Sequence, residues 1–197
     1  TTLNACLKEL HDGTRKINTL EDPIEYSLPG LRQSQVNGRI GLDFVELLTA
    51  MLRQAPDVIV IGEIRDAATA AVAIRAANSG HLVFATIHAP QAAGAVHSMF
   101  ALGAEPLFVA NCLLGVISQR LVRKVCSTCR VRNDSRVGRS RVLETPGAAG
   151  TLKTSTSTAP GCRQCQGLGY VGRTGLFELL SVNRALRDQI TDRAPSK

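Results

Sequence analysis

Acidic side chains follow an uninterrupted apolar run in the first third of the sequence. Residues Val58–Ile61 do not alternate with polar residues, which is typical of a strand buried on both faces of a parallel sheet. The run ends at Gly62, and Glu63 and Asp66 bracket Arg65 just beyond it. Ligands of open α/β sheets bind outside the carboxyl ends of strands, and an acid there commonly serves a nucleotide-bound Mg²⁺. The same acids could instead begin a helix, where carboxylates are also favoured.

A second candidate strand, residues 17–20, is followed by a cluster of acids. Glu21, Asp22 and Glu25 place three carboxylates within five residues, and Pro23 stiffens the turn between them. Taken alone, this cluster could be a solvated acidic loop. It also forms an acidic cluster at the end of another candidate strand.

A third candidate strand, residues 81–86, begins with His81 and is followed by His88. A single histidine beyond a strand is usually structural. However, three strand ends that carry acids or an imidazole should meet at one edge of a parallel sheet. We therefore expect these side chains to converge on one site.

The remaining pattern predicts an α/β fold. Apolar residues recur at helical spacing in five segments: 1–12, 42–54, 67–79, 91–102 and 107–118. Residues 28–40 are interrupted by Pro and Gly and predict a hairpin or an extended arm. Strands and helices that alternate in this way indicate a parallel sheet covered by helices.

Four of the six cysteines form two Cys-x-x-Cys pairs, at Cys126, Cys129, Cys162 and Cys165. Two such pairs can supply four thiolates to one tetrahedral Zn²⁺, and a site with four sulfur ligands is closed and structural. This spacing favours a metal in a reducing cytosol over disulfides. The other two, Cys6 and Cys112, are predicted to be small core residues.

Charge is unevenly distributed along the chain. The net charge is +7, and residues 1–125 are balanced, whereas residues 126–197 carry 12 Lys and Arg against 5 Asp and Glu. The five arginines between Arg130 and Arg141 could form a solubilising loop or contact anionic phospholipid, an acidic partner or nucleic acid. Residues 145–160 are rich in Gly, Ser and Thr and are expected to be mobile. Aromatic residues make up only 4% of the chain, so stacking platforms for single-stranded nucleic acid are not indicated.

Three segments resemble motifs of the type II secretion ATPases and the type IV pilus assembly ATPases. Residues 20–26 (LEDPIEY) resemble their aspartate box, residues 53–66 their Walker B segment and residues 80–88 (GHLVFATIH) their histidine box. The resemblance implies that Glu25 is the general base that orients the attacking water and that Glu63 is the Walker B acid. It also implies that His88 contacts the γ-phosphate region. Ala89-Pro90 departs from the family's usual residues after this histidine.

The resemblance implies ATP and Mg²⁺ as ligands, with a further set of binding residues: Thr1, Thr2, Glu21, Asp22, Arg65, Asp66 and His81. The phosphate-binding P-loop, which needs Gly-x-x-x-x-Gly-Lys-Ser/Thr, is not found, because no Gly-Lys pair occurs in the sequence. Thr1-Thr2-Leu3 resembles the residues just after that loop. We therefore expect a fragment that alone neither binds ATP tightly nor hydrolyses it.

The resemblance also divides the chain into three parts. Residues 1–121 are expected to be a RecA-like P-loop NTPase core that lacks its first strand and P-loop. Residues 122–170 resemble the family's tetracysteine zinc-binding subdomain. Residues 171–197 should form a short strand and helix that pack back on the core, with a strand at residues 176–180 and Asn183 as the helix cap.

The function implied is that of an ATP-hydrolysing motor subunit that powers type II secretion or type IV pilus assembly. Its expected partners are further copies in a homo-hexamer and an inner-membrane platform protein, at the cytoplasmic face of the inner membrane. No specific nucleic acid is expected. Two alternatives are a non-catalytic zinc-containing scaffold that has lost its P-loop and a zinc-ribbon nucleic-acid-binding module. The second alternative leaves the acids and histidine at the strand ends unexplained.

Overall fold

The computed structural model describes residues 2–133 and 156–192. These residues form two compact units: Thr1–Ser118 with Glu178–Lys197, and Gln119–Phe177. The sequence places the boundaries after residues 121 and 170, and this division into three parts stays a prediction. Most of the basic stretch at 130–141 and of the segment at 145–160 lies outside the described residues.

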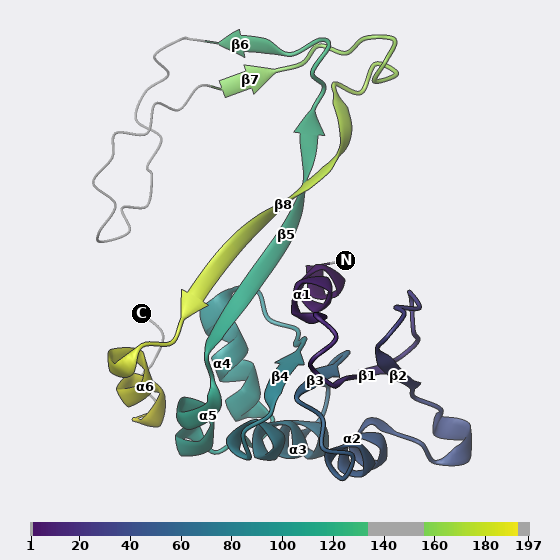
Figure 1. The fold of residues 1–197 in the computed structure, drawn as a ribbon. Coiled ribbons are helices and arrows are strands. Elements are labelled where there is room, and N and C mark those ends of the chain that lie inside the picture. Colours follow the sequence, from purple (N-terminus) through teal and green to yellow (C-terminus); the bar gives the residue numbers. More distant parts are fainter. Residues whose placement is uncertain (1, 134–155, 193–197) are drawn as a thin grey trace. The chain divides into compact units, whose positions relative to one another are not determined.

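A four-stranded parallel sheet forms the centre of the first unit (Figure 1). Its strand order is β2-β1-β3-β4, made by β1 (Ile17–Glu21), β2 (Arg32–Gln35), β3 (Val58–Ile61) and β4 (Leu82–Ala85). Leu20 pairs with Ile61, and Ile61 pairs with Ala85. The carboxyl ends of β1, β3 and β4 are therefore level, and the segments that follow them start at the same edge.

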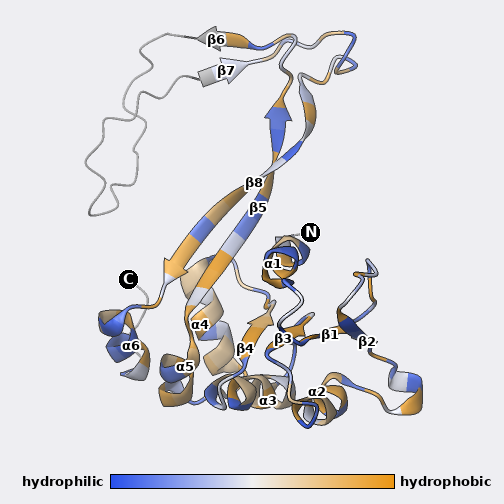
Figure 2. Cartoon of the chain, viewed as in Figure 1, coloured by the Kyte–Doolittle hydropathy of each residue, from blue (hydrophilic) through white to orange (hydrophobic). Residues whose placement is uncertain are grey.

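Helices cover both faces of this sheet. On one face, Leu7 of α1 (Thr2–Leu10) packs against Ile17, Val58 and Val60. On the other face, α2 (Phe44–Leu52) and α3 (Ala67–Asn78) pack against the remaining strand residues, among them Leu20, Ile59 and Ile61. All four residues of β3 are buried, as the apolar run predicts, and Figure 2 shows hydrophobic colour along β3 and β4.

Three more helices complete the first unit: α4 (Ala92–Ala101), α5 (Pro106–Cys112) and α6 (Arg184–Thr191). A separate apolar cluster joins them through Val96, Val109 and Ile190. Asn183 caps α6 by accepting a hydrogen bond from the N–H of Leu186 at 2.9 Å, as the sequence predicts. No helix among the described residues is long and apolar enough to cross a membrane.

Two expected elements differ in the structure. The arm at residues 28–40 is not a hairpin, because β2 within it pairs in parallel with β1 and is followed by a 3₁₀ helix, η1 (Gly38–Ile40). The helix expected at 107–118 ends at Cys112, and β5 (Gly115–Val125) begins instead. A Cβ at Gly115 would lie 2.9 Å from the carbonyl oxygen of Leu180, so this strand begins at a close backbone approach.

Long strands lead into and out of the second unit. β5 pairs with β8 (Tyr170–Ser181), which extends well beyond the strand expected at 176–180. The N–H of Val182 bonds to Leu114 at one end of the pair, and the N–H of Cys126 bonds to Gly169 at the other, so the strands are antiparallel. A short antiparallel pair, β6 (Val131–Asn133) and β7 (Thr156–Thr158), also belongs to the second unit.

The first turn of α4 is capped by a residue distant in sequence. Gln91, at the N-cap position, makes no side-chain cap bond, but Glu178 Oε2 of β8 accepts a hydrogen bond from the N–H of Ala92 at 2.9 Å. A carboxylate also interacts favourably with the positive end of the helix dipole. Glu178 thereby fixes the start of the helix that follows His88.

Replacing Glu178 with Ala should lower the free energy of unfolding by about 1 kcal/mol, because an N–H at the start of α4 loses its acceptor. Glu178→Gln keeps an acceptor oxygen and should lose less. Urea unfolding of the purified chain measures both values. Glu105→Ala is the matched control, since Glu105 stands at the N-cap of α5 without a side-chain cap bond. Equal losses for Glu178→Ala and Glu105→Ala would contradict the assigned cap.

Candidate functional site

A pocket of about 260 Å³ lies at the carboxyl edge of the parallel sheet. Residues that follow β1, β3 and β4 line it, together with the first turns of α1 and α2. The polar side chains among these residues are Asn4, Glu21, Asp22, Glu25, Glu63, Arg65 and Thr86. Acids from two strand ends, far apart in sequence, therefore converge on one cavity.

Glu63 connects the groups around this pocket. Its Oε1 lies 2.8 Å from Nε2 of His88, and its Oε2 accepts a hydrogen bond of 2.7 Å from Nε of Arg65. Arg65 also lies 4.0 Å from Oδ2 of Asp22, which links the end of β3 to the end of β1. The His88 side chain is 95% exposed. Exposed ion pairs contribute only about 0–1 kcal/mol, so stability does not account for this arrangement.

Backbone bonds beyond the regular ladder hold the three strand ends together. The N–H of Gly62 donates to the carbonyl of Leu20 at 2.7 Å, and the N–H of Ile64 donates to the carbonyl of Thr86 at 2.9 Å. The Thr86 hydroxyl donates to the carbonyl of Gly62. A Cβ at Gly62 would lie 3.0 Å from the Leu20 oxygen, so glycine permits this close approach. Glu63 is thus placed by backbone geometry on both sides.

The acids after β1 occupy different environments. Glu21 is half-buried, and its Oε1 accepts hydrogen bonds from the Thr19 hydroxyl at 2.7 Å and from Nε2 of Gln33 at 2.9 Å. Glu25 is exposed, lines the pocket and lies on the loop between β1 and β2. Glu21 is therefore held in place, whereas the Glu25 carboxylate is open to a ligand or water.

The first turn of α1 also faces the pocket, because Leu3 and Asn4 line it. Backbone N–H groups at a helix start point outward and favour an anion such as phosphate. Thr2 is the first residue of this helix, and Thr1 lies outside the described residues.

Three described residues of the predicted binding set do not line the pocket: Thr2, Asp66 and His81. Asp66 is the N-cap of α3, where its carboxylate accepts hydrogen bonds from the N–H and the hydroxyl of Thr69 at 2.7 and 3.0 Å. His81 precedes β4 at the opposite edge of the sheet, and its Nδ1 lies 2.9 Å from the carbonyl of Ala76. The contacts of Asp66 and His81 shown here are thus made away from the pocket.

Several residues of the site were not anticipated from the sequence. Asn4, Phe44 and Thr86 line the pocket, and Gln33 contacts Glu21. Thr86 could have been found, because it directly follows β4 in a parallel sheet. The glutamine carried no such signal, since its contacts depend on the parallel pairing of β2 with β1.

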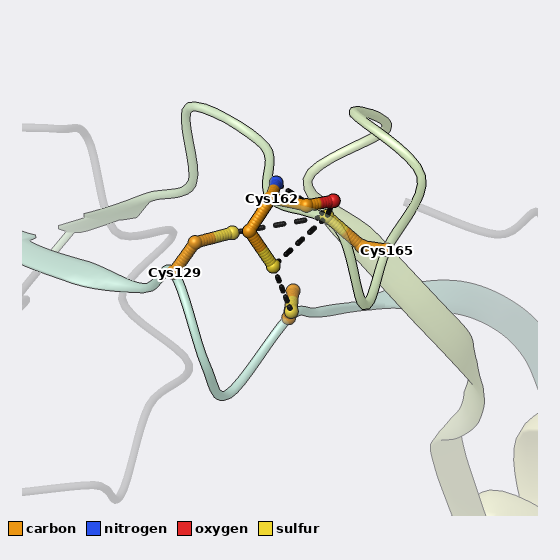
Figure 3. Close-up of side chains that lie close together, drawn as sticks. Cys129, Cys162 and Cys165 are labelled. Atoms are coloured by element: carbon orange, nitrogen blue, oxygen red, sulfur yellow. Dashed lines mark hydrogen bonds between the residues drawn. The ribbon is translucent and has the colours of Figure 1, made fainter.

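The second unit brings the four predicted metal ligands together (Figure 3). The sulfur atoms of Cys126, Cys129, Cys162 and Cys165 all lie within 4.8 Å of one another. Sγ of Cys126 is 3.9 Å from that of Cys162, and Sγ of Cys129 is 3.8 Å from that of Cys165. Four sulfurs spaced in this way fit the tetrahedral coordination of one Zn²⁺ at about 2.3 Å.

Backbone N–H groups stabilise the thiolate form of two of the four cysteines. The N–H groups of Cys162 and Gly169 lie 3.1 and 3.3 Å from Sγ of Cys165. The bond from Cys162 is the main cause that lowers the pKa of Cys165 to about 6. A backbone hydrogen bond from Cys129 similarly lowers the pKa of Cys126, whereas burial raises the pKa of Cys129 to about 12. Each pair thus offers one thiol that ionises readily, and a cation is needed to hold four thiolates.

Glycines allow the tight turns of the second cysteine pair. Gly169 has a φ of 73°, its N–H donates to Cys165 and its carbonyl accepts from the N–H of Cys126 at 2.9 Å. A side chain there would also collide with the carbonyl oxygen of Ala159. Gly169 consequently connects both cysteine pairs through its backbone.

The fold of the chain is similar to those of solved motor proteins and ATPases. The chain resembles the solved structure of the pilus retraction motor PilT with bound ADP, with a TM-score of 0.70 and 28% sequence identity over 98% of this chain and 46% of that one. It also resembles the ATPase DotB of Legionella pneumophila, with a TM-score of 0.63 over 97% of this chain and 46% of that one. At 22% identity the DotB match shows the fold alone. The α/β parallel-sheet fold predicted from the sequence is confirmed.

The chain belongs to the family of type II/IV secretion system proteins, whose model matches residues 1–196. It is 45% identical over 187 residues to the type II secretion system protein HxcR of Pseudomonas aeruginosa, covering 95% of this chain and 36% of that protein. It is 42% identical over 191 residues to the type IV pilus assembly ATPase PilB of Thermus thermophilus, covering 96% of this chain and 21% of that protein. The chain therefore spans little more than a third of such a type II relative, and the predicted family is confirmed.

Replacing Cys126 or Cys162 with Ser should abolish stoichiometric zinc binding, because three sulfurs no longer close the tetrahedral site. The purified chain should otherwise hold one zinc per molecule by elemental analysis. Cys6→Ser and Cys112→Ser are matched controls, since these thiols lie outside the cluster. Full zinc content in Cys126→Ser would contradict a four-sulfur site.

Zinc should leave the chain as the pH falls below about 6, because protons compete with the metal for the thiolates. The depressed pKa of Cys165 stabilises the folded state fully above the unfolded value of about 8.5, and this contribution is lost as the pH falls through about 6. A chromogenic zinc indicator measures release across the pH range. A release midpoint near pH 8 would contradict the stabilised thiolate.

Proposed function

We propose that the chain is the catalytic part of an ATP-hydrolysing motor subunit that powers type II protein secretion or type IV pilus assembly. The observation that supports this most strongly is the pocket at the sheet edge, where Glu25, Glu63 and Arg65 meet and His88 contacts Glu63. Phosphoryl transfer to water needs acids for a metal and a water molecule and cations for phosphates. The family membership is consistent with this chemistry.

The charged residues of the pocket and the neighbouring His88 have distinct roles in this proposal. Glu63, at the end of a buried strand, supports Mg²⁺ directly or through water. Glu25 is exposed on the neighbouring loop and orients the attacking water as general base. His88 contacts the γ-phosphate region, and its hydrogen bond to Glu63 couples that contact to the metal site. Asp22 and Glu21, with Arg65, complete the wall of the pocket.

The nucleotide needs more than these residues provide. ATP and Mg²⁺ would bind where the first turn of α1 faces the pocket, with Thr2 at the start of that helix. A P-loop lysine would have to reach the β- and γ-phosphates, and these 197 residues contain no Gly-Lys pair. We therefore propose that the 197-residue chain alone is inactive and that catalysis needs a P-loop lysine that these residues do not supply.

Membership of the family supports a proposal for the assembly and its location. We propose a homo-hexamer that acts with an inner-membrane platform protein at the cytoplasmic face of the inner membrane. The four-cysteine cluster would hold a structural Zn²⁺ that joins the two ends of the segment between the cysteine pairs. The basic residues between Arg130 and Arg141 would contact anionic phospholipid.

Substitution of the two glutamates tests this function in a full-length protein that includes the P-loop. Glu25→Gln should lower kcat for ATP hydrolysis about 100-fold or more with little change in KM, since a general base is lost. Glu63→Gln should weaken the dependence on Mg²⁺ and also lower kcat. Steady-state phosphate release measures both.

Glu46→Gln, at an exposed position of α2 outside the pocket, is the control and should behave as wild type. The 197-residue chain should release no phosphate above background. Normal turnover by Glu25→Gln, or turnover by the 197-residue chain alone, would overturn the proposed roles.

A further inference from the structure

The loop that carries Glu25 has no helix or strand of its own. Residues 22–31 connect β1 to β2, and Glu25 is exposed on this loop. A general base must be held within hydrogen-bond reach of the water it orients. Some other part of the chain must therefore fix the position of Glu25.

Gln33 of β2 makes three hydrogen bonds on the inner side of this loop. Its Nε2 donates to Oε1 of Glu21 at 2.9 Å and to the carbonyl of Tyr26 at 2.9 Å. Its Oε1 accepts from the N–H of Leu28 at 2.7 Å. Both amide hydrogens and the amide oxygen of this half-buried side chain are used.

Gln35, two residues further along the same strand, adds a fourth bond. Its Oε1 accepts from the N–H of Ile24 at 3.2 Å. Side chains at positions i and i+2 of a strand lie on one face of the sheet. The two glutamines therefore hold Ile24 and Tyr26, the residues on either side of Glu25.

The far end of the loop is anchored separately. Leu28 and Leu31 pack against the apolar cluster beneath α1, and a ring nitrogen of His11 lies 3.2 Å from the carbonyl of Pro29. The side-chain packing of the two leucines and the His11 contact do not involve the glutamines. A substitution in β2 should therefore free the segment around Glu25 without unfolding the domain.

We propose that Gln33 and Gln35 are positioning residues that hold Glu25 over the pocket. This inference rests on the role of Glu25 in the proposed function. Only a primary amide provides two donors and an acceptor in one group, and Gln33 uses all three. Gln35 uses only its oxygen, so the two positions have different chemical requirements.

Replacing Gln with Glu should therefore have different effects at the two positions, disruptive at position 33 and tolerated at position 35. Glu at position 33 has no donor for Tyr26 and places a second carboxylate against Glu21, so the side chain should leave the loop. Glu at position 35 still offers an oxygen to the N–H of Ile24. Leu at position 35 offers none.

Amide hydrogen exchange of the 197-residue chain, followed by NMR, directly measures how strongly the hydrogen bonds of the two glutamines protect the loop amides. Gln33→Glu should raise the exchange rate of the Leu28 amide about tenfold or more, as expected for one lost hydrogen bond. Gln35→Leu should do the same for the Ile24 amide, and Gln35→Glu should restore its protection. Exchange in the core of α3 should not change, which shows that the domain remains folded.

Kinetics of a full-length protein that includes the P-loop measure the consequence. Gln33→Glu should lower kcat about 100-fold with KM for ATP unchanged, because a small displacement of a catalytic group has this cost. Gln35→Leu should also lower kcat, and Gln35→Glu should recover most of it. In a Glu25→Gln background, Gln33→Glu should cause no further loss, since the positioned group is already gone.

The outcomes separate this inference from the function on which it rests. If Glu25→Gln leaves kcat unchanged, the proposed function fails, whatever the exchange data show. If Glu25→Gln lowers kcat while Gln33→Glu changes neither exchange nor kcat, the positioning role is wrong. The same holds if the loss from Gln33→Glu persists in full in the Glu25→Gln background, which would indicate general damage.

Discussion

The level alignment of β1, β3 and β4 is the constraint on which the edge pocket depends. β3 is buried on both faces, so its register is fixed by apolar packing against α1 on one side and α2 and α3 on the other. Hydrogen bonds of Gly62 and Ile64 continue this alignment past the last strand residues. The residues that follow these strands are therefore held close together. The Glu63 carboxylate lies 2.7 Å from Nε of Arg65 and 2.8 Å from Nε2 of His88. Electrostatic contacts at this edge follow from the packing beneath it.

The two units are stabilised in different ways. The first buries a sheet between helices, with Leu20, Leu48, Ile59 and Ile61 fully inside. The second has few buried side chains among its described residues, and Cys126 and Cys165 are two of them. A metal ion can replace an apolar core in so small a unit, because binding free energy becomes folding free energy. The backbone donors around Cys165 show that the polypeptide is arranged to favour thiolates even before charge from a metal is considered.

Much of this architecture could be predicted from residue patterns, and the failures have physical causes. The uninterrupted apolar run at 58–61 is compatible with only one kind of element, a buried strand, so β3 was predictable. The spacing of the cysteines likewise made the sulfur cluster predictable. Residues 32–35 (RQSQ) carry no apolar signal, and only pairing with β1 makes them a strand. Asp66 and His81 have the same residue types as residues of the site. However, Asp66 caps α3, and His81 precedes β4 at the opposite edge of the sheet. Residue type near a strand was therefore insufficient without knowing which end of the strand it follows.

In the proposed function, three distant segments surround one metal-bound nucleotide. Paramagnetic relaxation of backbone amides by Mn²⁺ with a non-hydrolysable ATP analogue measures this arrangement directly in a full-length protein that includes the P-loop. Residues 21–25, 62–65 and 86–88 should broaden selectively, with α6 unaffected. Broadening confined to one of these segments, or centred on another part of the chain, would rule out the proposed nucleotide site.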